Sequence, residues 1–183
     1  MRWLDGKTDF GWISIILHWA AAAVVVSLLF IGNSIQAGDS AARDHALWLH
    51  TTVALAAYGL LWLRVIWRMA KGHPGPLPRQ RRIDYAIGKP FHYLLIAAVA
   101  TMLVTGPLLA WSGDLPLRLW DLDIPSPFAP SAGLFELMLA GHIAAASVLG
   151  WGTLLHVLAV IKHMAIDRDG SFDRMMTPGE RSD

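Results

Sequence analysis

The stretch LFELMLAGHIAAASVLGWGTLLHVLAVIKH, residues 134–163, decides the fold, because it is apolar over a length that can cross a lipid bilayer. It carries two histidines, His142 and His156, fourteen residues apart. On an α-helix this spacing is about 21 Å of rise, and the two side chains return to within roughly 40° of one face. One helix therefore presents two imidazoles on the same side, at two depths of the membrane.

An ionisable side chain inside lipid is costly unless it has a partner, so such residues indicate a functional site. The hydrocarbon core is about 30 Å thick, so one imidazole can lie a short way inside each surface. The pattern predicts two metal or cofactor centres, one near each side of the membrane.

The composition is typical of an integral membrane protein of one domain: the 183 residues are 55% hydrophobic and 16% charged. The net charge of +1 gives no sign of a nucleic-acid partner, and none is expected. The chain has no cysteine, which excludes disulfides, thiolate zinc sites, iron–sulfur clusters and covalently attached haem. Any haem would be held without covalent attachment, by side chains such as His or Met.

Three further apolar runs are long enough to span a bilayer. We expect an all-α integral membrane bundle of four transmembrane helices in a single membrane domain, residues 1–183. Asp5 and Asp9 argue against reading the first run as a cleaved signal peptide. The proline-rich connection before the fourth helix should be an irregular cap. The predicted helices cover about residues 12–33, 46–67, 91–111 and 134–163, followed by a cytoplasmic tail at 164–183.

Lys and Arg residues are divided unequally between the connections. The connections after the first and third helices contain only Arg43 and Arg118, and all other Lys and Arg lie towards the opposite side. Cytoplasmic segments of membrane proteins carry an excess of these residues. We therefore expect both termini in the cytoplasm.

This topology gives each histidine a depth. His18 and His156 fall near the cytoplasmic surface, and His50 and His142 fall near the outer surface. Each pair links the fourth helix to a different neighbour, so both pairs can form at once. Two imidazoles in an apolar slot suit a bis-histidine haem better than zinc or copper, which would need more protein ligands. We expect two non-covalent b haems, an inner one at His18/His156 and an outer one at His50/His142.

Small residues near these histidines would make room for a flat macrocycle, although close helix packing explains them equally well. Arg64 and Arg68 follow His50 on the same helix face and lie at the depth of the inner haem. They are candidates for binding its charged propionates, and ordinary anchoring at the membrane surface is the alternative. The small residues are Gly141, Ala144 to Ala146, Gly150, Gly152 and Ala20 to Ala23.

The remaining histidines have weaker positions. His92 opens the third helix and His163 ends the fourth, and either could replace one inner ligand. His45 points away from His50, and His73 precedes Pro74 in a turn, so both are expected at the surface.

The segments I-x-L-H-W-A, W-L-H-x-T with the trailing L-R-V-I-W-R, and H-x13-H resemble the bacterial cytochrome b561 family. The resemblance covers nearly the whole chain. It implies a four-helix membrane bundle with two b haems, and it assigns the ligand roles to His18, His50, His142 and His156. It also implies electron exchange with ubiquinone, and the best understood branch takes electrons from superoxide at the outer face.

Two other functions stay open. A sister group implies a haem b anchor subunit that links a dehydrogenase or a hydrogenase to the quinone pool. The histidines could instead serve a metal or proton transporter. For the superoxide reaction, Arg43 and Arg118 are the outer cations that could attract the anion, while Arg64, Arg68 or His92 could border an inner quinone pocket.

Overall fold

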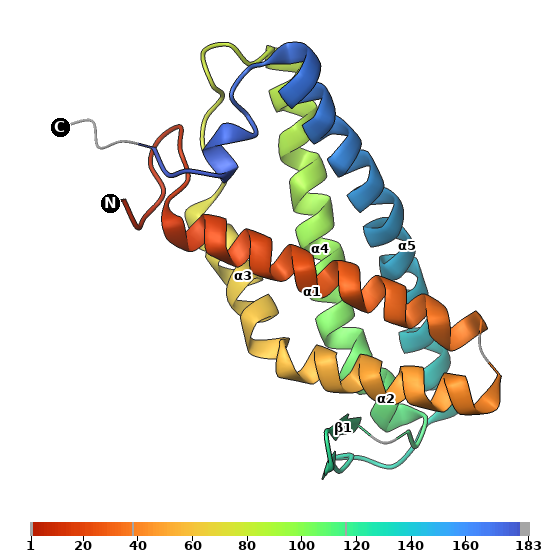
Figure 1. The fold of residues 1–183 in the computed structure, drawn as a ribbon. Coiled ribbons are helices and arrows are strands. Elements are labelled where there is room, and N and C mark those ends of the chain that lie inside the picture. The colour runs from red at the N-terminus through yellow and green to blue at the C-terminus, as the bar shows by residue number, and fades with distance from the viewer. Residues whose placement is uncertain (1, 38, 116, 180–183) are drawn as a thin grey trace.

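The computed structural model describes residues 2–37, 39–115 and 117–179. Helices dominate it: α1 (Trp12–Ala37), α2 (Ser40–Ala56), α3 (Tyr58–Lys71), α4 (Arg82–Ser112) and α5 (Ala132–Lys162). In Figure 1, α4 and α5 run side by side, and α1, α2 and α3 lie across them. Three of the helices can each span a membrane by length and composition, and α2 with α3 can form a fourth, bent span.

The predicted boundaries differ from the observed ones mainly in the second and third helices. The second helix was expected to be unbroken over 46–67. It begins at Ser40 and breaks at Ala57, where the chain bends by 51° between α2 and α3. The third, expected from residue 91, begins at Arg82 and includes Pro90. The first helix continues to Ala37, beyond the predicted end at residue 33. The sequence is apolar on both sides of Ala57, so hydropathy gave no indication of the bend.

The bend brings Tyr58 against a weak point of α4. Pro107 lies inside α4 and has no N–H, so the carbonyl of Leu103 lacks its usual helical donor. The hydroxyl of Tyr58 donates a hydrogen bond to that carbonyl at 3.0 Å. The first residue of α3 therefore satisfies the backbone group that the proline leaves unpaired.

Replacing Tyr58 by phenylalanine is expected to lower the free energy of unfolding by about 1–3 kcal/mol, because the Leu103 carbonyl would lose its donor. Thermal unfolding of the purified protein in detergent measures the change. Tyr93→Phe is the matched control, since the hydroxyl of Tyr93 makes no hydrogen bond within the described residues. Equal losses in the two variants would contradict this role of Tyr58.

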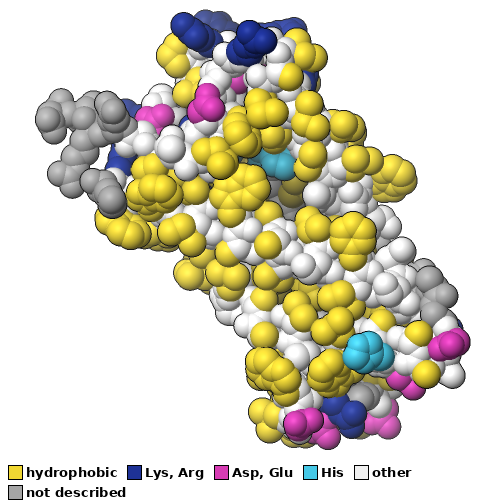
Figure 2. Space-filling view, in the orientation of Figure 1, with side chains coloured by type: hydrophobic (Ala, Val, Ile, Leu, Met, Phe, Trp, Pro, Cys, Tyr) yellow, Lys and Arg dark blue, Asp and Glu magenta, His cyan; other side chains and the backbone are white. Residues whose placement is uncertain are grey.

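The interior is small, and the surface is largely apolar. Two groups of buried side chains lie between the helices, and large apolar residues on α1, α3, α4 and α5 are exposed. Figure 2 shows hydrophobic side chains over the middle of the molecule, most of the visible Lys and Arg at the end above them, and acidic side chains at both ends. This surface suits a lipid environment. The buried groups are Ala21, Leu61, Val65 and Leu103, and Ala98, Ala145 and Leu149.

The described ends of the chain meet at one end of the bundle, which we call the terminal end. Residues after α5 form a π-helical turn (His163–Asp167) and a short 3-10 helix (Asp173–Met175). Trp19 donates to the carbonyl of Met175, and Arg174 donates to the carbonyl of Gly75. The predicted tail is therefore packed against the bundle as far as residue 179.

The opposite end carries the connection between α4 and α5, and we call it the hairpin end. This connection contains an antiparallel pair of strands, β1 (Leu117–Leu119) and β2 (Leu122–Ile124), where an irregular cap was expected. The N–H of Ser131 donates to the carbonyl of Ser112, which closes the loop. The fold is thus all-α except for this small hairpin.

Candidate functional site

The structure brings four of the predicted site histidines together in two pairs, each between α5 and another helix. His18 of α1 lies beside His156 at the terminal end, with ring centres 6.2 Å apart. His50 of α2 lies beside His142 at the hairpin end, with ring centres 6.4 Å apart. All four histidines are half-buried, and the rings of each pair are inclined by about 70°.

These separations match two imidazoles that share one metal. Ring centres on opposite sides of a metal lie about 6 Å apart, because each bond is about 2 Å long and the nitrogen is about 1 Å from the ring centre. Two imidazoles packed directly against each other, with no metal between them, could have their ring centres closer together. Both pairs therefore leave space for a metal atom between them.

Glycines flank the rings at the hairpin end. A Cβ added at Gly32 would lie 3.4 Å from Cε1 of His50, and one added at Gly106 would lie 3.7 Å from Cε1 of His142. Because both residues are glycines, no side chain at these positions of α1 and α4 fills the space beside the two rings.

The small residues predicted to make that room have different surroundings. A Cβ at Gly152 would come within 2.6 Å of a side-chain carbon of Leu95, so this glycine serves the close packing of α4 against α5. A Cβ at Gly150 would meet no atom within 4 Å. Gly32 was missing from the predicted set, and only its depth, close to that of His50, could have suggested it.

Two more histidines extend the pair at the terminal end. His92 of α4 lies 5.1 Å from His156, and His73 lies 5.3 Å from His92, measured between ring centres. The separation from His92 to His156 is shorter than the two pairs above and leaves less space for a shared metal. The Nδ1 of His92 faces the carbonyl of Gly88, which can only accept, so this nitrogen carries the proton.

His73 differs from its predicted surface position. It is half-buried and packs against the rings of Phe10 and Tyr85 as well as His92. Burial lowers the pKa of His73 below its ordinary value, although its hydrogen bond to the Pro74 carbonyl opposes this effect. His45, in contrast, is exposed as expected.

His163 belongs to a cluster of acidic groups. Its Nδ1 lies 3.0 Å from a carboxylate oxygen of Asp167 and 2.9 Å from one of Asp169. Lys162 contacts the carboxylates of Asp84 and Asp167 in the same cluster. Carboxylates therefore surround His163, and no ring contact joins it to His18 or His156 among the described residues.

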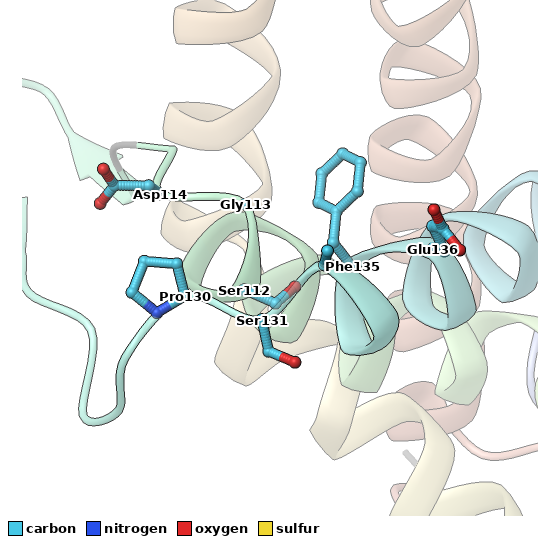
Figure 3. Close-up of a pocket in the computed structure, with 8 residues that line it drawn as sticks. Ser112, Gly113, Asp114, Pro130, Ser131, Phe135 and Glu136 are labelled. Carbon is cyan, nitrogen blue, oxygen red and sulfur yellow. The ribbon is translucent and has the colours of Figure 1, made fainter.

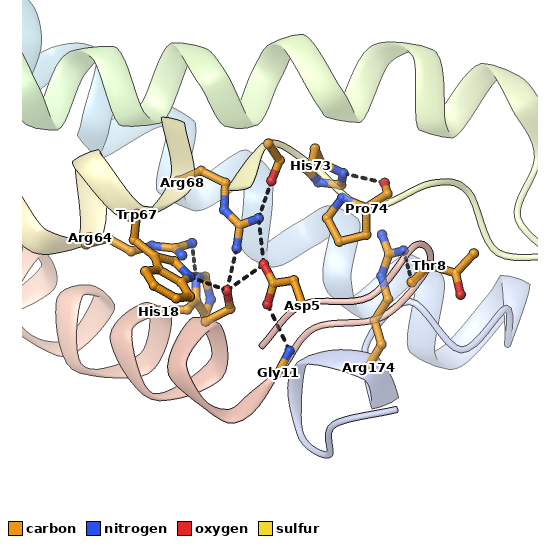
Figure 4. Close-up of polar contacts among 12 residues, drawn as sticks. Asp5, Thr8, Gly11, His18, Arg64, Trp67, Arg68, His73, Pro74 and Arg174 are labelled. Atoms are coloured by element: carbon orange, nitrogen blue, oxygen red, sulfur yellow. Dashed lines mark hydrogen bonds and ion pairs between the residues drawn. The ribbon is translucent and has the colours of Figure 1, made fainter. Parts of the chain in front are cut away.

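Arg68 is fully engaged in a buried network at the start of α1, shown in Figure 4. It forms an ion pair with Asp5 at 3.4 Å and donates to the hydroxyl of Ser14 at 3.0 Å and to the carbonyl of Gly72. Asp5 accepts further hydrogen bonds from the Gly11 N–H and the Ser14 hydroxyl. Arg68 is only 4% exposed, so its partners are structural.

Arg64 has a different environment one turn earlier on α3. Its Nη2 lies 3.5 Å from Nδ1 of His18, and its Nη1 is buried without a hydrogen-bond partner in the part of the chain described. None of the described carboxylates forms an ion pair with it. A buried cation without a counter-ion beside His18 suits a negatively charged ligand group.

The two predicted outer cations do not gather at one site. Arg43 is exposed near the start of α2, and Arg118 pairs with Asp123 across the hairpin at 2.6 Å. Figure 3 shows the open hollow at this end, between the end of α4 and the start of α5. Asp114 and Glu136 line it, and none of its described lining residues is a cation, so its charge disfavours anions.

Comparison with known proteins agrees with this geometry. The family model described as prokaryotic cytochrome b561 matches residues 9–178. Cytochrome b561 homolog 2 of Escherichia coli (strain K12) is 25% identical over 189 aligned residues, which cover 96% of this chain and 95% of that protein. The family match spans all five helices and both histidine pairs. The chain therefore belongs to the prokaryotic cytochrome b561 family.

Proposed function

We propose that this chain is a di-haem membrane cytochrome, in which His18 and His156 hold one b haem and His50 and His142 hold the other. Proteins of the family bind haem b and act in electron transfer. The observation that carries the assignment is the presence of two imidazole pairs with ring centres 6.2 and 6.4 Å apart. Bound haem would supply one-electron redox chemistry, and the chain supplies ligands, an apolar surround and charge.

In this proposal Arg64 offsets the charge of a propionate at the terminal end. The side chain is buried, adjoins His18 and has an unpartnered Nη1 among the described residues. Guanidinium groups bind carboxylates through two parallel hydrogen bonds, which suits this task. Arg68 is assigned a structural role, because Asp5 and Ser14 already occupy its donors.

Changing Arg64 to glutamine is expected to lower the midpoint potential of the haem at the terminal end, because a nearby positive charge favours the reduced state. One charge acting over about 10 Å at an effective dielectric constant of about 20 is worth about 1.7 kcal/mol. We therefore expect a decrease of about 70 mV for a one-electron couple, measured by redox titration of the purified protein. Arg64→Lys keeps the charge and should retain most of the potential, so an equal decrease in both variants would contradict this role.

We further propose that the terminal end faces the cytoplasm of a bacterial inner membrane and that the hairpin end faces outward. The Lys and Arg residues other than Arg43 and Arg118 lie in segments towards the terminal end, and this bias supports the orientation. An electron that enters from outside moves against an inside-negative potential, at about 2.3 kcal/mol per 100 mV for the full membrane. The donor must therefore be strongly reducing.

Superoxide meets that requirement, and ubiquinone is the proposed acceptor. Two superoxide anions would give two O2 and two electrons, and these electrons with two protons would reduce one ubiquinone to ubiquinol. The proposal of superoxide as donor rests on its reducing power and not on attraction of its negative charge. The hollow at the hairpin end is acidic, and Arg118 is already paired with Asp123.

The same acidic surface favours a second candidate function, the haem b anchor subunit of a dehydrogenase or hydrogenase. Such a subunit receives electrons from a bound partner and has no need to attract a small anion.

The purified chain in detergent tests both candidates. Reduction by dithionite should give a b-type spectrum with two haems per chain, and enzymatically generated superoxide should reduce a soluble ubiquinone analogue without any added subunit. A b-type spectrum without that activity would favour the anchor subunit. A chain that binds no haem after growth in ample iron would overturn the proposal.

A further inference from the structure

The hydroxyl of Thr105 lies between two groups on neighbouring helices. Thr105 belongs to α4 and is 6% exposed. Its Oγ1 is 2.7 Å from the carbonyl oxygen of Thr101 and 2.9 Å from Nδ1 of His142 on α5.

A hydroxyl has one proton, which determines the direction of both hydrogen bonds. The carbonyl of Thr101 can only accept, so the Thr105 hydroxyl donates to it. The same oxygen must then accept from His142, whose Nδ1 carries a proton. In a neutral imidazole the other nitrogen, Nε2, keeps its lone pair and is free to bind a metal.

The methyl group of Thr105 supports the same side-chain position. A Cβ added at Gly141, the residue before His142, would lie 3.4 Å from Cγ2 of Thr105. This is an ordinary van der Waals distance, so the methyl group of Thr105 packs directly against α5 at this position. The hydrogen bond to the Thr101 carbonyl and the contact of its methyl group with α5 together hold the Thr105 side chain in place.

We propose that Thr105 is a positioning residue that fixes the protonated nitrogen of His142 and lowers the midpoint potential of the haem at the hairpin end. This inference rests on the proposed function, which makes His142 a haem ligand. An acceptor at Nδ1–H makes the imidazole a stronger donor through Nε2, and a more basic ligand stabilises the oxidised metal.

The terminal end has the opposite arrangement. There the guanidinium of Arg64, which can only donate, lies 3.5 Å from Nδ1 of His18 and offers that nitrogen no acceptor, and its positive charge stabilises the reduced metal. No hydroxyl forms a hydrogen bond with a ring nitrogen of His18 or His156 among the described residues. The two ends therefore favour a lower potential at His50/His142 and a higher one at His18/His156, which directs electrons from the hairpin end to the terminal end.

The test is a redox titration of the purified protein with its haems, followed by optical spectra, for the wild type, Thr105→Val and Thr105→Ser. Valine keeps the shape of threonine without an acceptor, and serine keeps the hydroxyl. We expect valine to raise one of the two midpoint potentials without moving the other, and serine to leave both near the wild-type values. The shifted component should be the one that His142→Ala lacks.

Each result separates this inference from the proposed function. Unchanged potentials in Thr105→Val, with two haems still bound, would overturn the role of Thr105 and leave the di-haem assignment intact. Retention of both haems in His142→Ala would instead overturn the assignment itself. Loss of one haem in the valine variant alone would support the need for the hydroxyl, whereas loss in both Thr105 variants would overturn it.

Discussion

Replacing His156 by alanine is expected to remove one of two haems from the purified chain, whereas replacing His92 by alanine leaves both bound. The two histidines are neighbours, with ring centres 5.1 Å apart, so they form a matched pair of variants. His18 lies 6.2 Å from His156, the separation that a metal between two imidazoles requires. The predicted haem content is therefore about one per chain for His156→Ala and two for His92→Ala.

The pyridine haemochrome assay, normalised to protein concentration, measures this difference. The haem that remains in His156→Ala should be the one that His142→Ala loses, and the two single-haem spectra should add up to the wild-type spectrum. If His92→Ala lost a haem while His156→Ala kept two, the ligand at the terminal end would be His92, and the pairing would be wrong.

The relation between the four histidines could be predicted because it depends on local helix geometry. The rise and turn of one helix fix the positions of His142 and His156 relative to each other. The direction of each span then gives His18 and His50 their depths, and the structure brings these residues to the expected neighbours. None of this required knowledge of side-chain packing.

The features that sequence analysis missed depend on contacts between helices. A threonine within a helix usually bonds back to the carbonyl four residues earlier, as Thr101 does with Ala97. Thr105 makes that bond too, and only the closeness of α5 at Gly141 adds His142 as a second partner. The bend at Ala57 also involves a contact between helices, because it brings Tyr58 against α4. The hydropathy of α2 and α3 does not indicate it.

The N-terminal segment shows a similar limit. Residues 1–11 form a short, polar segment, and nothing in their composition indicates that they pack against the bundle. The structure buries Asp5 among Gly11, Ser14 and Arg68, with 6% of the Asp5 side chain exposed. The ion pair between Asp5 and Arg68 therefore holds the N-terminal segment against the terminal end of the bundle.

Replacing Asp5 by alanine should therefore lower the free energy of unfolding by about 3–5 kcal/mol, more than replacing Asp9 in the same segment. The change leaves Arg68 as a buried charge without its carboxylate, and breaking a buried pair in this way costs about that much. It also removes the acceptor for the Gly11 N–H at the start of α1. Thermal unfolding in detergent, followed by far-ultraviolet circular dichroism, measures the loss.

Asp9→Ala is the matched control, because Asp9 lies in the same segment but its side chain is 31% exposed. Its ion pair with Arg2 is also longer, at 4.0 Å. Exposed pairs of this kind contribute about 0–1 kcal/mol, so the control should unfold near the wild-type temperature. The double variant Asp5→Ala with Arg68→Leu should recover part of the loss, since it removes the unpaired cation as well. Equal unfolding temperatures for Asp5→Ala and Asp9→Ala would show that the buried pair does not hold the segment. Recovery in the double variant would instead show that the cost of Asp5→Ala comes from the isolated charge of Arg68 and not from lost packing.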